Sequence, residues 1–335
     1  MSEIKVGIIG LGFMGKTHLA AFGARTSQCR VVAVADANID KASLATAGNL
    51  ASTGSVDLTG IRTYTTAQQL LSDADIDLVS VCTPTDTHRD LALAAIAAGK
   101  HLLLEKPVAV ASADVRLVAA AVRPGLVAMP AMVMRFWPGW PWLRERIHEA
   151  RAGKGDFGRL VGVTFQRLGS APAWNPDFYA SEARTGGALT DLHIHDSDFI
   201  LWCFGPPART SSVGSLNHVT TQYVYRDGPD HIVAQGGWGH SPGFPFVMRY
   251  VAVFEKATAM FDLSGGAAPV TVFRDGVLSQ PALPTLSSYQ LEIDHMLDAV
   301  AAARSGAPFE LRATMQDAVA VAELLEGERA SLTAR

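Results

Sequence analysis

A lysine at the end of an apolar segment is the first residue in this sequence placed to do chemistry. Residues 101–104 are followed by Glu105, Lys106 and Pro107. The pKa of a lysine falls readily when its ammonium is partly desolvated, and the charged group can orient a hydroxyl and stabilise a developing alkoxide. Taken alone, a Glu-Lys pair at a strand end is more often solvated surface, so this interpretation depends on the residues around it.

The second group is Asp191 and His195, which follow the glycine pair Gly186-Gly187. If a helix begins near the glycines, the two side chains are one turn apart and share a face. A carboxylate beside an imidazole is what a general base for an alcohol proton needs. The stretch therefore predicts acid–base chemistry on a hydroxyl.

Other polar residues lie in the same stretch, and we expect His193 and Asp196 to point elsewhere as ordinary helix surface. A metal site is the alternative, because Asp191, His193, His195 and Asp198 are possible ligands. No cysteine or second compact group of ligands completes such a site, so no metal is expected.

A glycine-rich turn at the start of the chain is typical of nucleotide binding. The apolar segment 4–9 leads directly into Gly10-Leu11-Gly12-Phe13-Met14-Gly15, and a helix is expected from about residue 15. The first glycine allows a tight turn, the second lets a pyrophosphate approach the backbone, and the third lets the helix pack on the strand. The phosphates then face free N–H groups at the helix N-terminus, so all six residues are predicted cofactor contacts.

An acidic residue at the end of the next apolar segment indicates which nucleotide binds. Segment 31–35 ends in Asp36, at the spacing expected for the acid that binds the adenosine ribose hydroxyls. Ala37 and Asn38 follow, with no arginine, and a carboxylate repels a 2′-phosphate. NAD is therefore expected rather than NADP. The alternative is a structural turn with an exposed loop aspartate.

The segment after a third apolar stretch, 77–82, offers further polar groups. It contains Thr83, Pro84 and His88 at the carboxyl end of the expected strand, the edge at which open α/β sheets bind ligands. We expect these three residues, with Glu105 and Lys106, to contact the cofactor. For His88 the alternative is a surface histidine that starts a helix.

The pattern of elements predicts two domains. Residues 1–128 alternate strand-like and helix-like segments, which indicates an α/β Rossmann domain with a doubly wound parallel sheet. Residues 129–335 contain strand-like runs in sequence, which indicates an α+β domain with a large, open, mostly antiparallel sheet. The expected strands are 4–9, 31–35, 77–82, 101–104 and 126–129, then 159–168, 210–216, 220–226, 231–238, 246–254, 257–263 and 269–273. The expected helices are 15–24, 40–47, 66–72, 87–98, 112–122, 139–151, 286–305 and 311–330.

Composition limits the possible partners and compartment. The chain has 335 residues, 48% hydrophobic and 18% charged, with a net charge of −4. This gives no electrostatic reason to expect nucleic acid or an anionic membrane as a partner. No leader or spanning segment is evident, and three scattered cysteines fit free thiols, so a cytoplasmic protein is expected.

Taken together, these stretches resemble the Gfo/Idh/MocA oxidoreductase family, which includes inositol and glucose–fructose oxidoreductases. The matching residues are the early glycine turn, Cys82-Thr83-Pro84 through His88, Ala98 through Pro107, and Gly186-Gly187 through His195, with Ala188 where a third glycine is usual. The resemblance implies NAD-dependent hydride transfer at a carbinol carbon of a sugar, inositol or related polyol. It implies Lys106, Asp191 and His195 as catalytic residues that converge around the nicotinamide, Arg135 as a further contact, and a homodimer or homotetramer.

Several alternatives stay open at this level. The residues also fit an NAD-using glycosidase of the same family, or a non-catalytic NAD-binding sensor. The tryptophans at 137, 140 and 142 could stack on a sugar ring, but burial statistics favour a core position. Trp174 and Arg184 could line the pocket, although ordinary structural positions are favoured for both.

Overall fold

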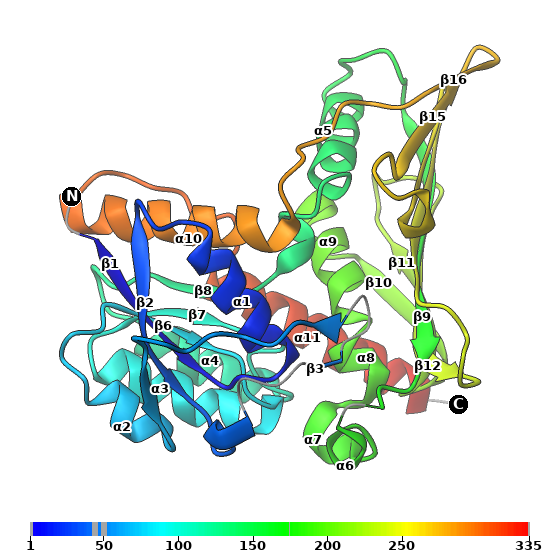
Figure 1. The fold of residues 1–335 in the computed structure, drawn as a ribbon. Helices are drawn as coiled ribbons and strands as arrows, with labels where there is room; N and C mark the ends of the chain where they lie inside the picture. The colour runs from blue at the N-terminus through cyan, green and yellow to red at the C-terminus, as the bar shows by residue number, and fades with distance from the viewer. Residues whose placement is uncertain (1–2, 42–45, 48–51, 174, 334–335) are drawn as a thin grey trace. The chain divides into compact units, whose positions relative to one another are not determined.

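The chain folds into two compact units in a computed structural model that describes residues 3–41, 46–47, 52–173 and 175–333. Unit 1 comprises Met1–Val133 and Ser288–Val319, and unit 2 comprises Met134–Ser287 and Ala320–Arg335 (Figure 1). The division expected from the sequence, at residue 128, differs from these units mainly in the placement of residues 288–319.

Unit 1 is built on a parallel sheet. Among the described residues, six strands lie in the order β5 (Arg62–Tyr64), β2 (Cys29–Ala35), β1 (Ile4–Ile9), β6 (Leu78–Val81), β7 (His101–Leu104) and β8 (Ala128–Pro130). Every pair of neighbours runs parallel. The central strands are almost wholly buried, as expected for a sheet covered on both faces. The predicted doubly wound fold is confirmed.

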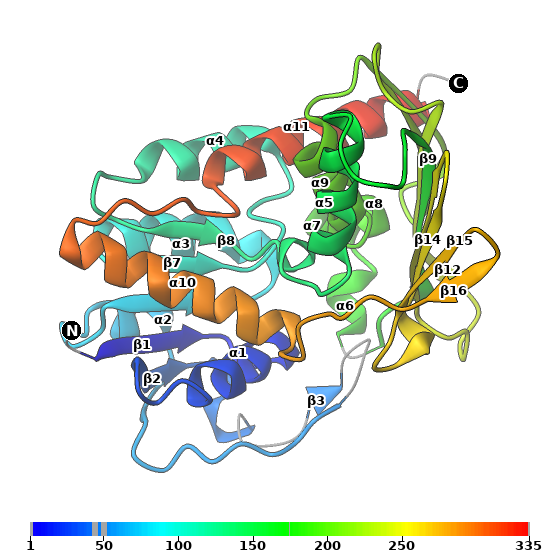
Figure 2. The ribbon, with the colours of Figure 1, turned by 90° about the horizontal axis from the view of Figure 1, so that it is seen from above.

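Helices cover both faces of this sheet (Figures 1 and 2). The helices α1 (Phe13–Gly23) and α10 (Ser288–Ser305) lie on one face; on the other are α2 (Ala67–Leu71), α3 (His88–Ala97) and α4 (Ser112–Ala121). The helix expected over 40–47 is wrong for the described part of that range, which holds a 3-10 turn at Ile39–Lys41 and the short strand β3 (Thr46–Ala47), paired with β4 (Ser52–Thr53). Residues 42–45 lie outside the described residues.

The helix α10 belongs to unit 1 although it follows unit 2 in the sequence. Its buried face includes Ile293, Met296 and Val300. Asp294 accepts hydrogen bonds from Arg25, which follows α1, and Arg304 forms an ion pair with Asp77 at 2.8 Å. A period of 3.6 predicts such a helix but does not say which sheet it covers, because its partners lie far away in the sequence.

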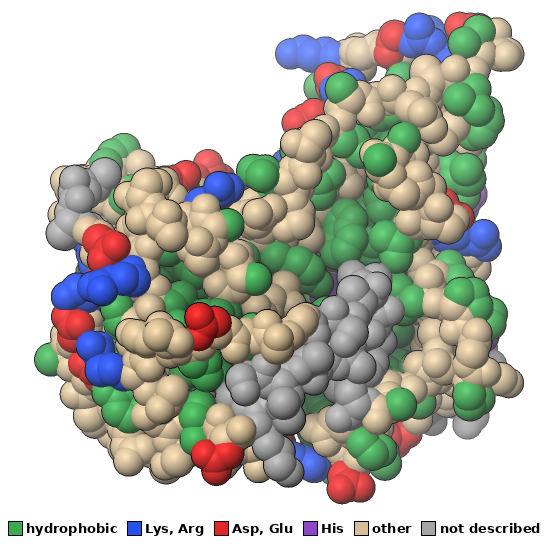
Figure 3. Space-filling view, in the orientation of Figure 1, with side chains coloured by type: hydrophobic (Ala, Val, Ile, Leu, Met, Phe, Trp, Pro, Cys, Tyr) green, Lys and Arg blue, Asp and Glu red, His purple; other side chains and the backbone are tan. Residues whose placement is uncertain are grey.

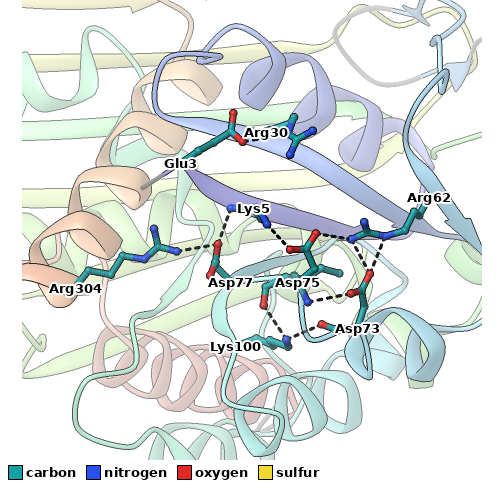
Figure 4. Close-up of polar contacts among 10 residues, drawn as sticks. Glu3, Lys5, Arg30, Arg62, Asp73, Asp75, Asp77, Lys100 and Arg304 are labelled. Atoms are coloured by element: carbon teal, nitrogen blue, oxygen red, sulfur yellow. Dashed lines mark hydrogen bonds and ion pairs between the residues drawn. The ribbon is translucent and has the colours of Figure 1, made fainter. Parts of the chain in front are cut away.

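The ion pair of Arg304 is part of a charged network at the amino ends of the parallel strands (Figure 4). Asp77 accepts a hydrogen bond from the Lys5 backbone N–H at 2.7 Å, and Arg62 lies 2.8 Å from Asp73. Lys100 is buried and donates to two backbone carbonyls. These groups lie at the edge of the sheet opposite to the glycine turn, so they stabilise unit 1 without facing its predicted site.

Unit 2 is built on a second sheet, eight-stranded among the described residues. Its order is β10 (Arg209–Ser215), β11 (His218–Val224), β12 (His231–His240), β9 (Leu160–Ser170), β13 (Val247–Phe254), β14 (Thr258–Asp262), β15 (Val270–Arg274) and β16 (Val277–Ser279). All neighbours are antiparallel except β12 and β9, which run parallel. The predicted open, mostly antiparallel sheet is confirmed; β5 and β16 were not predicted.

Helices pack on the sheet of unit 2 and form its core. They are α5 (Trp140–Arg151), α6 (Pro176–Tyr179), α7 (Glu182–Thr185), α8 (Gly187–Asp191), α9 (Ile194–Phe204) and the second part of α11 (Met315–Thr333). Trp140 is fully buried and makes edge contacts with Phe199, Tyr250 and Phe261. The interpretation of this tryptophan as core is confirmed.

The surface carries charges of both signs. On the face shown in Figure 3, lysine and arginine side chains lie among aspartate and glutamate side chains over unit 1. On unit 2, Phe273, Val277 and Leu278 of the last two strands are exposed. No helix in the described residues combines the length and apolar character needed to cross a bilayer.

A buried acid on α10 generates a stability prediction. Burial, opposed by His18 and assisted by nearby Glu105, raises the pKa of Glu292 to about 8. Its Oε1 has no hydrogen-bond partner among the described residues. In the unfolded chain the pKa of a glutamate is about 4.3. Between these values the folded state binds more protons, so this group's contribution to the free energy of unfolding declines as pH rises.

We therefore expect Glu292→Gln to be increasingly stabilising relative to the natural protein from pH 5 to pH 8. The difference should grow by up to about 1.4 kcal/mol per pH unit, measured by urea unfolding. Glu323→Gln, an exposed position on α11, is the control and should leave the difference constant. Parallel stability curves for Glu292→Gln and the natural protein would contradict the assignment.

Candidate functional site

The glycine turn of unit 1 has the geometry that its spacing predicts. Gly10 has φ +89°, which favours glycine, and a Cβ at Gly15 would lie 1.8 Å from the Gly10 carbonyl oxygen. Neither position tolerates a side chain. Gly12 is the N-cap of α1 without a side-chain cap, and a Cβ there would meet nothing within 4 Å. The backbone at the start of α1 is therefore open to an anion.

Asp36 lies beside this turn at the end of β2. Its carboxylate accepts hydrogen bonds from the backbone N–H of Leu11 at 2.7 Å and of Asn38 at 2.8 Å. The first of these bonds joins the carboxyl ends of β1 and β2. Lys16, which sequence reasoning treated only as the start of a helix, is buried nearby; burial lowers its pKa and Asp36 opposes this.

The strand order gathers the predicted cofactor residues at one edge of unit 1. The strands β2, β1, β6 and β7 are consecutive neighbours and parallel. The glycine turn, Asp36, Thr83 and Lys106 follow their carboxyl ends, where the strand order reverses and such sheets bind ligands. A Cβ on Gly10 would lie 2.7 Å from the carbonyl oxygen of Cys82, so the turn and the loop after β6 are in contact.

His88 connects two loops at this edge. It is only 1% exposed, so the alternative of a surface histidine is wrong. Its Nδ1 lies 2.7 Å from the carbonyl oxygen of Pro107, and its Nε2 lies 2.7 Å from that of Thr83. Burial lowers the pKa of His88, and the two carbonyls oppose this. The side chain ties the loop after β6 to the one after Lys106; direct contact with a cofactor stays a prediction.

Glu105 is buried and paired with a histidine that sequence reasoning missed. Its carboxylate lies 3.2 Å from Nε2 of His18 on α1, whose Nδ1 lies 2.8 Å from the hydroxyl of Ser80. Burial alone would lower the pKa of His18, but Cys82 and Glu105 raise it well above its usual value. Burial would raise the pKa of Glu105, and His18 lowers it. The pair fixes the residue before Lys106, and its only sequence signal is a histidine on the apolar side of α1.

In unit 2 the predicted continuous helix through Asp191 and His195 is wrong. The helix α8 ends at Asp191 and α9 begins at Ile194, so the two side chains belong to different helices. At the break, the backbone N–H of Leu192 and that of His193 both donate to the carbonyl of Ala188. The backbone at the glycines lies close to its neighbour, because a Cβ on Gly187 would lie 2.8 Å from the Leu216 carbonyl oxygen.

Burial singles out the two predicted catalytic residues on this segment. Residues 185–200 are all described, and among them only Asp191 and His195 are not buried. The other residues of this range are all buried. Two titratable groups therefore stay partly accessible on a segment that is otherwise fixed by packing.

The expectation that the neighbouring polar residues form ordinary helix surface is wrong. Asp196 is 1% exposed and accepts hydrogen bonds from Arg167 of β9, with the shorter contact at 2.8 Å. Asp198 is equally buried and is bound by Nε and Nη2 of Arg135, with the shorter contact at 2.6 Å. Inside a protein, a charge is tolerated only when paired in this way.

Arg135 is therefore an internal ion-pair partner of unit 2, and its predicted contact with cofactor or substrate stays a prediction. Among the described residues, no group of three or more histidine, cysteine, aspartate or glutamate side chains is arranged to hold a metal ion. Trp174 lies outside the described residues.

Comparison with protein families decides the relationship of the chain. Residues 4–131 match the model described as oxidoreductase family, NAD-binding Rossmann fold, and residues 146–272 match the GFO/IDH/MocA C-terminal domain. The chain belongs to the Gfo/Idh/MocA oxidoreductase family. Unit 1 contains its NAD-binding Rossmann domain, as the sequence predicted.

Curated relatives match this chain over different lengths. The rhizopine catabolism protein MocA of Rhizobium meliloti is 30% identical over 97% of this chain and 94% of its own length. Inositol 2-dehydrogenase 2 of Saccharopolyspora erythraea is 29% identical over 62% of this chain and 56% of its own length. The chain thus spans little more than half the length of some curated relatives it matches.

A levoglucosan dehydrogenase in complex with NADH superposes with a TM-score of 0.77 at 19% identity, covering 98% of this chain and 97% of the other. This likeness shows the fold.

The position of Asp36 predicts cofactor preference. Asp36→Ala should weaken NAD binding by about 10- to 100-fold, because charge-assisted hydrogen bonds are worth roughly 1.5–3 kcal/mol. It should also improve binding of NADP, since the repulsion of a 2′-phosphate is removed. Titration of both nucleotides by fluorescence measures this, with Asp40→Ala, an exposed acid nearby, as the control. An unchanged ratio of NAD to NADP affinity would remove Asp36 from the ribose site.

Proposed function

We propose that the protein is an NAD-dependent dehydrogenase that oxidises a carbinol carbon of a sugar, inositol or related polyol. Family membership and the names of relatives such as inositol 2-dehydrogenase support this class of substrate. The observation that carries the proposal is the accessibility of Asp191 and His195 on a segment that is buried everywhere else. A carboxylate and an imidazole presented in this way serve to bind a hydroxyl and remove its proton.

The residues of unit 1 fit a dinucleotide. The uncapped start of α1 and the open space at Gly12 suit the pyrophosphate, and Asp36 suits the adenosine ribose. When bound, the nicotinamide supplies the hydride acceptor.

The chain's own residues then have distinct roles in the proposal. Lys106 orients the substrate hydroxyl and stabilises negative charge that develops on its oxygen. His195 removes the hydroxyl proton, and Asp191 binds a neighbouring hydroxyl. Assembly into dimers or tetramers and a cytoplasmic location stay predictions.

The test is a screen of the purified protein with NAD against sugars, inositols and glycosides, read at the NADH absorbance band. A dehydrogenase accumulates NADH in proportion to the product formed. Cleavage of a glycoside without net NADH would instead identify an NAD-using glycosidase. Binding of NAD with no turnover on any of these compounds would favour a sensor and contradict the proposal.

Lys106 should be essential for turnover and not for cofactor binding. Lys106→Met is expected to lower kcat by at least about 100-fold, because a charged donor to the developing alkoxide is lost. The dissociation constant of NAD should stay within tenfold. Lys154→Met, at an exposed position in unit 2, is the control and should keep full activity. A kcat within a few-fold of the natural protein for Lys106→Met would refute the role.

His195 should set the pH dependence of oxidation. A general base acts only when deprotonated, so kcat should rise with pH over the neutral range in which an imidazole loses its proton. His195→Gln should lower kcat by about 100-fold and flatten this rise. The measurement is kcat for polyol oxidation from pH 5.5 to 9. If the variant keeps the same pH profile as the natural protein, another group is the base.

A further inference from the structure

A buried carboxylate lies beneath the break between α8 and α9. Glu328 of α11 is 0% exposed and accepts hydrogen bonds from two elements of unit 2. Ser197 and Tyr223 donate to its Oε1 at 3.1 and 2.9 Å, and Thr221 donates to its Oε2 at 3.0 Å. The fourth contact is Nε2 of His193, 3.0 Å from Oε2. These four donors match the acceptor positions of a carboxylate.

His193 is the member of this group that reaches the break itself. It lies between α8 and α9, two residues after Asp191 and two before His195. Its ring packs on β12, where a Cβ at Gly236 would lie 2.7 Å from Nδ1. The ring is therefore fixed by β12 on one side and, at Nε2, by Glu328 and by the Tyr223 hydroxyl at 3.1 Å, so the backbone of the break has little freedom to shift.

The next residue of α11 holds the other end of α8. Arg329 donates to the carbonyl oxygen of Gly186 at 3.1 Å, and Gly186 is the N-cap of α8. Two consecutive residues of α11 thus bind the segment just before α8 and the segment just after it. A helix of five residues has little stability of its own, so its position depends on such contacts.

We propose that Glu328, acting through His193 and assisted by Arg329, is a positioning residue for Asp191 and His195. The inference rests on the proposed function, because it concerns the geometry of those two side chains during proton transfer. Glu328 takes no part in the proton transfer itself; it fixes the backbone that carries the two proposed catalytic residues. Misplacement of a catalytic group by about 1 Å costs about 100-fold in rate.

The decisive variants are conservative. Glu328→Gln keeps the shape of the side chain but replaces one carboxylate oxygen, an acceptor, by an amide NH2 group, a donor. At least one neighbouring donor then loses its acceptor, so kcat should fall by about 10-fold or more. His193→Ala should produce a similar loss. His193→Gln restores a donor near Nε2 and should recover most of the activity. The affinity for NAD, which depends on unit 1, should stay within about twofold in every variant.

The control is Tyr250→Phe, which removes a buried hydrogen bond of unit 2 to the carbonyl of Gly139, away from the break. This variant shows the effect on kcat of a loss of stability that does not displace Asp191 and His195. All values of kcat are compared at a temperature at which circular dichroism shows every variant to be folded. A kcat of Glu328→Gln equal to that of Tyr250→Phe would overturn the inference, as would a loss confined to KM.

A measurement independent of turnover separates this inference from the proposed function. The ring proton signal of His195, assigned with His195→Gln, is followed by NMR from pH 5 to 9. At a given pH, the chemical shift of this signal in Glu328→Gln and in His193→Ala should differ from that in the natural protein. In Tyr250→Phe it should equal that in the natural protein. A signal unmoved by Glu328→Gln overturns the positioning role, whether or not the natural protein oxidises a polyol. A moved signal with no turnover on any substrate supports the positioning role and refutes the proposed function.

Discussion

The requirement that a buried charge be paired controls the segment that carries the proposed catalytic residues. Inside a protein the free energy cost of an unpaired charge is large compared with the small net stability of the fold. Each such group therefore needs a partner with good geometry. Arg135 satisfies this with Asp198, Arg167 with Asp196, and Glu328 with four donors. Each pairing joins a different element to α9 or to the break before it. These pairings therefore fix the position of α9 and of the break before it.

The same requirement shapes unit 1 behind Lys106. His18 and Glu105 are buried together. Glu105 raises the pKa of His18 and His18 lowers the pKa of Glu105, so each favours the charged form of the other. Both ring nitrogens of His88 lie 2.7 Å from carbonyl oxygens of the two loops at the carboxyl edge. The glycine turn contributes a steric constraint, since Gly15 and the Gly10 carbonyl leave no room for a Cβ. Charge pairing and close backbone approach together define the surface offered to a dinucleotide.

The features that were predictable from the sequence are those with a local cause. The strand at 4–9, the glycine turn and Asp36 lie within a short range, and the spacing alone places them. The break at Leu192 and His193 was not predicted, and the ring of His193 at this point contacts Glu328, which lies far away in the sequence. The burial of Arg135 was missed for the same reason, since its partner lies 63 residues away. The packing of α10 on the sheet of unit 1 has no local signal, because the pattern of an amphipathic helix does not specify the sheet on which it packs.

A polar cluster can thus be misread when only its own element is considered. A run such as His193, Asp196 and Asp198 has the composition of solvated helix surface, and its neighbours in sequence give no reason to bury it. The structure buries these three and leaves Asp191 and His195 accessible. This division is chemically useful, because the buried groups spend their hydrogen bonds on holding the segment while the accessible pair can be reached by a ligand. The residues that do the proposed chemistry are distinguished from their neighbours by partial accessibility, and residue type alone does not separate them.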